Sequence, residues 1–151
     1  MSQRIRPQVL GVARRDGALF VSELTDPGSG ETFYRPPGGG VEFGETSAEA
    51  VVREFREELD AVVEPVGYLG TVENRFEWNG DPAHEIAVVH DVEFEDDRFY
   101  EEAPFRGVDA GGAVTYEATW EPLGDLLAGE RPLYPEGLAE LLDGEAVHLV
   151  V

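Results

Sequence analysis

Residues 39–61 read GGVEFGETSAEAVVREFREELDA, a glycine-rich turn followed by one strongly patterned helix. Thr46 and Glu49 fit a T-x-x-E capping box, which predicts a helix from about residue 47 to about residue 60. Five apolar residues recur at helical spacing within an arc of about 100°, which must face a core. They are Ala48, Val51, Val52, Phe55 and Leu59. The stretch therefore predicts an amphipathic helix packed against a core that the rest of the chain supplies.

The same helix carries three glutamates, Glu54, Glu57 and Glu58, on one flank beside its apolar face. Glu58 borders the apolar edge, where its carboxylate would be partly desolvated. Like charges at this spacing repel, and Arg53 supplies only one cation against three anions. A hard divalent cation would compensate them, because such ions prefer carboxylate oxygens.

The alternative for this flank is an ordinary solvated face, because E-x-x-E-E arises often in a chain with 32 acidic residues. The upstream residues argue against it. Five residues separate Gly39 from Glu45, and seven separate Glu45 from Arg53. The full string is rare by chance in a chain of this composition, so the pattern indicates a site.

The composition limits what such a site binds. The chain has 151 residues, of which 42% are hydrophobic and 10% aromatic, and this predicts a folded chain, most simply one domain over residues 1–151. With 32 acidic residues against 11 basic ones, the formal net charge of -21 argues against polymeric nucleic acid as a partner. A phosphate-bearing substrate would need a divalent metal and a few placed arginines.

Residue usage also bears on the cellular setting. The chain has no cysteine, which excludes disulfides and cysteine-based metal sites. It has neither a signal-peptide core nor a run of about 18 apolar residues, so we expect a soluble, cytoplasmic protein without membrane contact. All 11 basic residues are arginine, which fits either a high-GC genome or adaptation to high salt.

Short apolar runs on both sides of the helix predict strands. Residues 9–15 and 18–24 are joined across an Asp-Gly turn, and the tract 36–40, PPGGG, predicts an irregular segment that permits close backbone approach to a ligand. The other expected elements are strands over 32–36, 66–74, 85–94 and 113–123, a loop over 75–84, a turn-rich connection over 95–112 and a short helix over 135–144. Strands and helices interleave, so the expected fold class is α/β (α+β), a sandwich around a mixed sheet.

One histidine lies within a predicted strand. His90 shares a face by period two with Ile86, Val88, Val92 and Phe94. Because these neighbours are apolar, we interpret His90 as a hydrogen-bonded, half-buried strand residue in preference to a ligand.

The spacing within residues 39–61 resembles the signature of the Nudix hydrolases, G-x5-E-x7-R-E-U-x-E-E-x-G-U, in which U is a bulky apolar residue. The resemblance extends to the entering FYRPPGGG, to the strands on both sides and to ATWEPL followed by a short helix. It implies a Nudix-like α/β/α sandwich around a mixed β-sheet. Two positions depart, because Asp60 replaces the Gly and Ala61 is small for the last apolar position. Since Asp tolerates the left-handed conformation better than most residues, we expect an altered helix exit and a retained site.

The resemblance implies a metal-dependent pyrophosphohydrolase that cleaves a nucleoside diphosphate linked to another group X, with Mg2+ or Mn2+ as the cofactor. By the family pattern, Glu57 and Glu58 are the principal metal ligands. Glu54 is a further ligand or the base that deprotonates water. The main-chain carbonyl of Gly38 joins them.

The family pattern also implies supporting roles. Arg53 orients the glutamates through its planar fork, and Glu45 anchors the loop against the helix. The candidates for substrate contact are Arg35, Gly39, Trp78 and Glu117. Arg35 is expected to meet a phosphate oxygen, the alternative being a surface ion pair.

Downstream side chains supply further candidates. Glu117 stands where the family often has a late acidic residue that touches metal or base, the alternative being a solvent-facing strand glutamate. Glu73 and Glu85 are lesser candidates for the same role. Three aromatic residues are candidates for stacking on a nucleobase, the alternative being core or loop packing. These are Phe76, Trp78 and Tyr116, whereas Trp120 is assigned to the core.

The substrate subtype stays open. Pro82 lies later than the proline of ADP-ribose enzymes, and Trp78 stands near the tyrosine position of diadenosine polyphosphate enzymes. The candidates are a nucleotide sugar, an ADP-ribose-like compound, a dinucleoside polyphosphate and an oxidised nucleoside triphosphate. The expected partner is a small-molecule nucleotide, and the expected assembly is a monomer or homodimer. The alternative function, suggested by Asp60, Ala61 and the missing subtype marks, is a catalytically weak or inactive domain that acts as a nucleotide-binding sensor.

Overall fold

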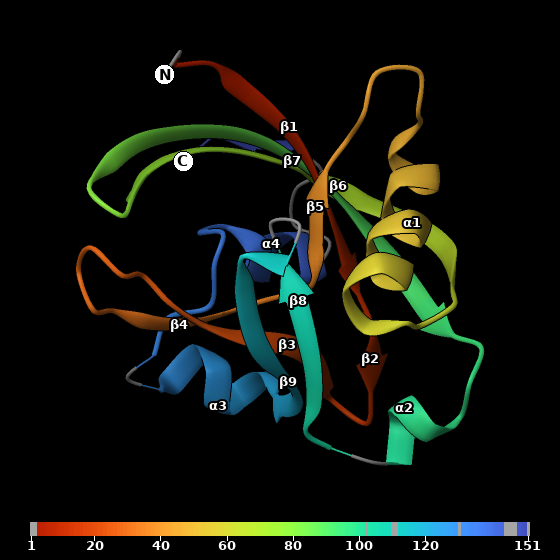
Figure 1. Cartoon of the computed structure of the whole chain (residues 1–151). Coiled ribbons are helices and arrows are strands. Elements are labelled where there is room, and N and C mark those ends of the chain that lie inside the picture. Colours follow the sequence, from red (N-terminus) through yellow and green to blue (C-terminus); the bar gives the residue numbers. More distant parts are fainter. Residues whose placement is uncertain (1–2, 102, 110–111, 130, 144–147, 151) are drawn as a thin grey trace.

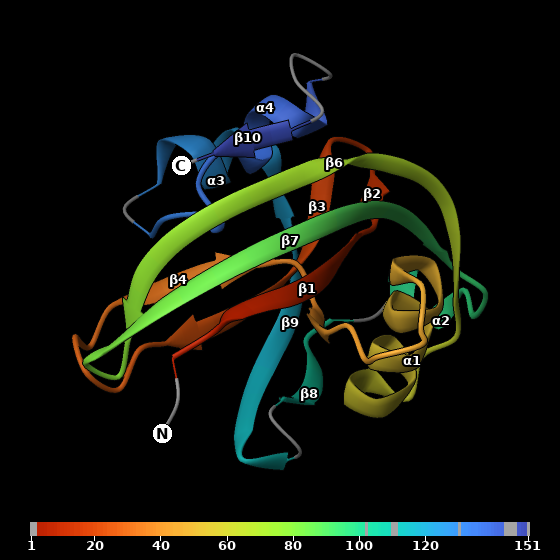
Figure 2. The same ribbon diagram turned by 90° about the horizontal axis from the view of Figure 1, so that it is seen from above.

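The structure of the protein is a computed structural model that describes residues 3–101, 103–109, 112–129, 131–143 and 148–150. The strands form two sheets, with α1 on one side of them and α3 and α4 on the other (Figure 1, Figure 2). In chain order the elements are β1 (Ile5–Val12), β2 (Arg14–Arg15), β3 (Ala18–Thr25), β4 (Thr32–Arg35), β5 (Gly38–Gly40), α1 (Ser47–Leu59), β6 (Val63–Trp78), β7 (Asp81–Phe94), α2 (Arg98–Glu101), β8 (Phe105–Asp109), β9 (Val114–Pro122), α3 (Leu123–Ala128), α4 (Leu138–Leu142) and β10 (His148–Val150).

The first sheet has the strand order β10-β6-β7-β1-β5 and is mixed. In this sheet β1 runs parallel to β7, and β10 runs parallel to β6, whereas the β6–β7 and β1–β5 pairs are antiparallel. The second sheet has the order β2-β3-β9-β8, with β4 beside β3, and its pairs are antiparallel. The expected α+β sandwich around a mixed sheet is confirmed.

Two Xaa-Gly dipeptides make the tight turns of the fold. Asp16 and Gly17 have φ values of 51° and 80°, which confirms the predicted hairpin turn. Asn79 and Gly80 have φ values of 54° and 81° and connect β6 directly to β7. The predicted loop over 75–84 is therefore wrong, because a two-residue turn with both residues left-handed lets the two strands continue to it.

Two other predicted irregular segments contain regular structure. Gly38–Gly40 of the PPGGG tract pairs with β1 as β5. A Cβ on Gly38 would collide with the Val9 carbonyl oxygen, so this close pairing requires glycine at that position. The connection over 95–112 contains α2 and β8, which bury Phe99 and Phe105 in the core. The helix α4 lies within the short helix predicted over 135–144, and α3 begins at the end of ATWEPL, where the resemblance implied a short helix, whereas β10 was not predicted.

The helix α1 begins and ends as its sequence indicates. The Thr46 side chain accepts from the backbone N–H of Glu49, and the Glu49 side chain accepts from that of Thr46, so the capping box is confirmed. Asp60 adopts the left-handed conformation with φ 51° and donates its N–H to the Arg56 carbonyl, while Ala61 is fully buried. The departures at residues 60 and 61 are therefore accommodated.

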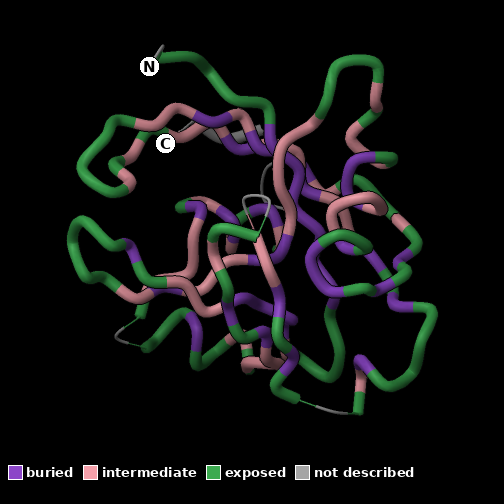
Figure 3. The backbone as a smooth tube through the Cα atoms, in the orientation of Figure 1, coloured by how far each residue is buried: buried purple, intermediate pink, exposed green. Residues whose placement is uncertain are grey.

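The buried face of α1 is wider than the predicted arc. The helix buries Ala50 and Glu58 in addition to Val51, Phe55 and Leu59, because it packs against β5 and β8 as well as β1. Ala48 and Val52, which were expected in the core, are only half-buried. A Cβ on Gly11 of β1 would lie 2.5 Å from the Phe55 ring, so this glycine lets the helix approach the sheet closely. Figure 3 shows the buried residues where α1 and the strands meet, and the exposed ones at the outer hairpin ends.

Strand β7 contributes to two cores rather than presenting one apolar face. Ala87 and Val89 pack in the core beneath α3 and α4, whereas Val92 and Phe94 pack in the core beneath α1. The predicted single face from Ile86 to Phe94 is thus wrong, since the strand is covered on opposite sides at its two ends. No helix among the residues that the structure describes is long and apolar enough to cross a membrane.

Candidate active site

Arg53 joins the loop before α1 to the carboxylates on the helix. Its Nε and Nη2 atoms bond to the two oxygens of Glu45 at 2.7 and 2.9 Å, and Nη2 also donates to the Gly40 carbonyl at 2.8 Å. Its Nη1 atom lies 3.0 Å from Glu54 Oε1 and 3.2 Å from Glu57 Oε2. Hydrogen bonds from Arg53 lower the pKa of Glu45, and the pKa of Arg53 is raised, chiefly by Glu45. Arg53 therefore links Glu45 to the carboxylates of the helix, and the orienting and anchoring roles of the two residues stay predictions.

The Glu58 carboxylate is the most deeply buried of the three on α1, with a relative exposure of 7%. Its Oε1 atom accepts a hydrogen bond of 2.8 Å from the Tyr116 hydroxyl, and its Oε2 atom has no partner among the described residues. The same carboxylate lies within hydrogen-bonding reach of Glu54. Burial first, then the Glu54 contact and the charge of Asp109, raise the pKa of Glu58 to about 10. Two carboxylates that interact directly need a shared proton or a cation between them.

Gly39 allows Glu54 to lie against the backbone of β5. A Cβ at this position would lie 2.5 Å from Glu54 Oε2. Two residues of the triplet thus need to be glycine for different reasons. A Cβ on Gly38 would collide with the backbone of β1, and a Cβ on Gly39 would collide with the Glu54 carboxylate. The sequence predicted close backbone approach to a ligand in this tract, whereas the approach seen at Gly39 is to the Glu54 carboxylate of the protein itself.

Glu57 lies at the rim of the cluster. Its side chain is 59% exposed and is paired with Arg53. In the part of the chain that the structure describes, no three His, Cys, Asp or Glu side chains are gathered closely enough to hold a metal ion. The structure therefore brings Glu54 and Glu58 together, with Glu57 beside them on the same helix but turned to Arg53.

Arg35 is engaged in an ion pair. Its Nη2 atom lies 3.3 Å from Oε1 of Glu85, a strand residue that is only 6% exposed. Asn74, which pairs with Glu85 in the β6–β7 register, has a buried Oδ1 atom without a partner among the described residues. The ion pair, which was the alternative to a phosphate contact for Arg35, is thus observed. It is half-buried and links β4 to β7.

The aromatic candidates lie in different environments. Trp78 is half-buried at the end of β6 and meets the ring of Phe33 edge-on at 6.1 Å, and Phe76 is half-buried on the same strand. Trp120 is half-buried, packs against the α1 core beside Phe20 and donates its Nε1–H to the Phe99 carbonyl, so its core assignment is confirmed only in part.

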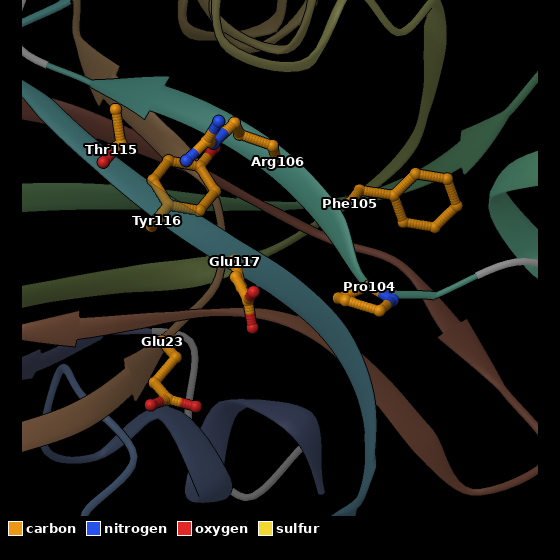
Figure 4. A pocket seen from close by; sticks show the side chains of 7 residues that line it. All are labelled: Glu23, Pro104, Phe105, Arg106, Thr115, Tyr116 and Glu117. Atoms are coloured by element: carbon orange, nitrogen blue, oxygen red, sulfur yellow. The ribbon is translucent and has the colours of Figure 1, made fainter.

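Glu117 is not brought to the carboxylate cluster. Tyr116 and Ala118 are buried beneath α1, so the intervening Glu117 is exposed on the other face of β9. There it lines an open pocket of about 370 Å3 together with Glu23 and Arg106 (Figure 4). The residue that does reach the cluster is its neighbour Tyr116, which is 5% exposed and was expected only as a stacking candidate. The alternation of buried and exposed side chains along a strand is the sequence signal that could have placed Tyr116, and not Glu117, on the side of the cluster.

His90 is hydrogen-bonded and half-buried, as expected. Its Nε2 atom lies 2.8 Å from Ser47 Oγ at the start of α1, and burial lowers its pKa. Glu73 is half-buried on β6, where it pairs in register with Ile86 of β7.

Comparisons with known proteins identify the family. The family model of the NUDIX domain matches residues 4–141, and the chain belongs to this family. The structure is similar to that of a MutT NUDIX hydrolase from Burkholderia pseudomallei, with 26% sequence identity, a TM-score of 0.65 and coverage of 93% of this chain and 98% of that one. This membership confirms the resemblance to the Nudix hydrolases seen in residues 39–61.

Two more distant structures share the fold. A MutT protein from Methanosarcina mazei Go1 is 20% identical, with a TM-score of 0.63 and coverage of 95% of this chain and 94% of that one. An ADP-ribose pyrophosphatase from Streptococcus suis is 15% identical, with a TM-score of 0.55 and coverage of 97% and 98%. No curated protein matches the sequence at a significant level.

Proposed function

We propose that this protein is a metal-dependent pyrophosphohydrolase that cleaves a nucleoside diphosphate linked to another group. The observation that carries the proposal is the contact between the Glu54 and Glu58 carboxylates, with Glu58 Oε2 buried and without a partner among the described residues. Such an arrangement is unfavourable for two anions unless a cation lies between them.

The donor set at this position fits Mg2+ or Mn2+. Hard divalent cations prefer carboxylate and carbonyl oxygens, and the buried Glu58 carboxylate adjoins that of Glu54, which lies against the backbone of β5. Glu54 and Glu58 would hold the ion, with Glu57 and the Gly38 carbonyl as the further ligands. When bound, a divalent cation neutralises pyrophosphate charge and makes water more acidic.

The protein's own residues would position the reacting groups. Arg53 holds Glu54 and Glu57 on one side of the site and the Gly40 carbonyl on the other, so the carboxylates and the glycine strand form one unit. If Glu57 and Glu58 hold the ion without Glu54, the Glu54 carboxylate is the candidate for the base that takes the proton from attacking water. Arg35 uses one N–H for Glu85 and keeps other donors for a phosphate oxygen.

The substrate class follows from charge and from the relatives. A formal net charge of -21 disfavours nucleic-acid polymers and favours a small nucleotide held through a metal ion. The similar structures are named as MutT proteins and an ADP-ribose pyrophosphatase. Nucleotide sugars, ADP-ribose-like compounds, dinucleoside polyphosphates and oxidised nucleoside triphosphates are therefore the compounds to test.

The left-handed conformation of Asp60 and the buried position of Ala61 weaken one motivation for the sensor alternative, whereas the missing subtype marks still leave it as the second candidate. The test is a panel of these four compound classes, incubated with purified protein and Mg2+ or Mn2+. We expect cleavage of at least one class and a loss of about 100-fold or more in kcat for Glu58→Gln. A panel that is left uncleaved, or a fully active Glu58→Gln variant, would falsify the proposal.

A further inference from the structure

We propose that Tyr116 is a positioning residue that holds the Glu58 carboxylate with Oε1 bonded to its hydroxyl and Oε2 free for the metal. The inference rests on the proposed function, because it assigns a role within the same metal site. Tyr116 lies on β9 and Glu58 on α1, and their 2.8 Å hydrogen bond joins the helix to the second sheet. Both residues are at least 90% buried, so water does not compete for this bond.

The tyrosine hydroxyl also lies close to β3. Ser22 of β3 is 2% exposed and near enough to influence the pKa of Tyr116, which burial raises above its ordinary value. Because burial keeps the phenol protonated, its proton is available for the bond to Glu58 Oε1. The strand β9 and the helix α1 together therefore set where the Glu58 carboxylate points.

The ring of Tyr116 also has a fixed position. Gly107 of β8 is the register partner of Tyr116, and a Cβ on Gly107 would collide with the Tyr116 ring and hydroxyl. The tyrosine ring thus lies over a glycine, which leaves the room that the ring and hydroxyl need in this position. A side chain held in this way loses little further freedom when the site is occupied.

The consequence for Glu58 is that its two oxygens are no longer equivalent. One oxygen is bonded to Tyr116, and the other is buried, without a partner among the described residues, in a carboxylate that reaches Glu54. Groups that hydrogen-bond to metal ligands orient them, and their removal weakens metal binding by about 10- to 100-fold. A buried tyrosine that served only packing would not show this dependence.

The test measures Mn2+ binding directly, by calorimetry or by the loss of the free Mn2+ signal in electron paramagnetic resonance. For Tyr116→Phe we expect the Mn2+ dissociation constant to rise about 10-fold. At subsaturating Mn2+, kcat should fall while the KM for the nucleotide stays unchanged. The matched control is Tyr100→Phe, which also removes one tyrosine hydrogen bond, here the one from the Phe94 N–H, and should leave Mn2+ binding unchanged.

Three outcomes separate the explanations. Wild-type protein that cleaves its substrate, together with a Tyr116→Phe variant that binds Mn2+ as tightly as wild type, overturns the positioning role and leaves the proposed function intact. Wild-type protein that neither binds Mn2+ nor cleaves any compound overturns both. If Tyr116→Phe does not fold, Gly107→Ala replaces it, because a Cβ at residue 107 would collide with the Tyr116 hydroxyl and displace it from Glu58. Unchanged Mn2+ affinity in Gly107→Ala then counts against the inference.

Discussion

The Nε atom of Arg53 lies 2.7 Å from Oε2 of Glu45, and a second bond of 2.9 Å completes a bidentate pair. The pair closes the loop between β5 and α1, and Arg53 simultaneously contacts Glu54 and Glu57. The loop, the glycine strand and the carboxylates are therefore held by one guanidinium group. Lysine carries the same charge but lacks the planar fork that makes these contacts together.

Arg53→Lys should lower kcat by about 10- to 100-fold, because a single ammonium group cannot hold both Glu45 oxygens and the helix carboxylates. Steady-state kinetics on the identified substrate measures this effect. Arg56→Lys is the matched control. Arg56 lies on the same helix, but its side chain is 65% exposed and pairs with the exposed Asp60 at the longer distance of 3.6 Å. Equal activity of the two variants would show that the fork geometry is unimportant.

The raised pKa of Glu58 predicts how the stability of the metal-free protein depends on pH. An unfolded chain releases this proton near pH 4.5, whereas the folded protein retains it to about pH 10. Between these values the native state binds more protons, so its free energy of unfolding falls as pH rises, by at most about 1.4 kcal/mol per pH unit. Glu58→Gln cannot ionise and should escape this loss.

We therefore expect Glu58→Gln to exceed wild type in free energy of unfolding by about 1 to 3 kcal/mol at pH 8.5, and by little near pH 4.5. Urea unfolding in the presence of a chelator measures both values. Glu57→Gln, at an exposed position of the same helix, should change stability by no more than about 0.5 kcal/mol. The idea fails if wild type and Glu58→Gln are equally stable at pH 8.5.

The parts of the fold that sequence predicted well depend on local chemistry. The capping box at Thr46, the Asp16–Gly17 turn and the left-handed Asp60 each involve residues close together in the chain, where the side chain itself selects the conformation. The Asn79–Gly80 turn belongs to the same class and carried the same signal. Because this turn was not recognised in the sequence, residues 75–84 were predicted as a loop, although most of them extend β6 and β7.

The parts that sequence missed depend on tertiary packing. Gly38–Gly40 forms a strand because β1 lies beside it, and Ala50 is buried because β5 and β8 cover that side of α1. The contact between Tyr116 and Glu58 joins residues 58 positions apart, so neither position shows it locally. The cluster of charged residues on α1 was predictable because one helix carries most of it, whereas the groups that hold it come from distant strands.

Gly39→Ala should displace Glu54, because its Cβ would lie 2.5 Å from that carboxylate. We expect kcat to fall by about 10-fold or more and Mn2+ binding to weaken, with the helix content unchanged by circular dichroism. Gly40→Ala is an adjacent control, because a Cβ there meets only the Gln8 side chain at 3.7 Å, an ordinary contact. Similar activity in both variants would mean that Glu54 can move without consequence.

Arg35 offers a test that separates substrate contact from structural pairing. If Arg35 donates to a phosphate oxygen, Arg35→Lys should raise KM by about 10-fold with little change in kcat, since it removes binding common to the ground and transition states. If its only role is the ion pair with the buried Glu85, the variant should lower the free energy of unfolding and leave KM unchanged. Arg131→Lys is the control, because Arg131 pairs with the more exposed Glu23 at 2.9 Å. A KM shift in Arg35→Lys that is absent in Arg131→Lys assigns Arg35 to the substrate, and unfolding curves of the same samples show whether Glu85 depends on it as well.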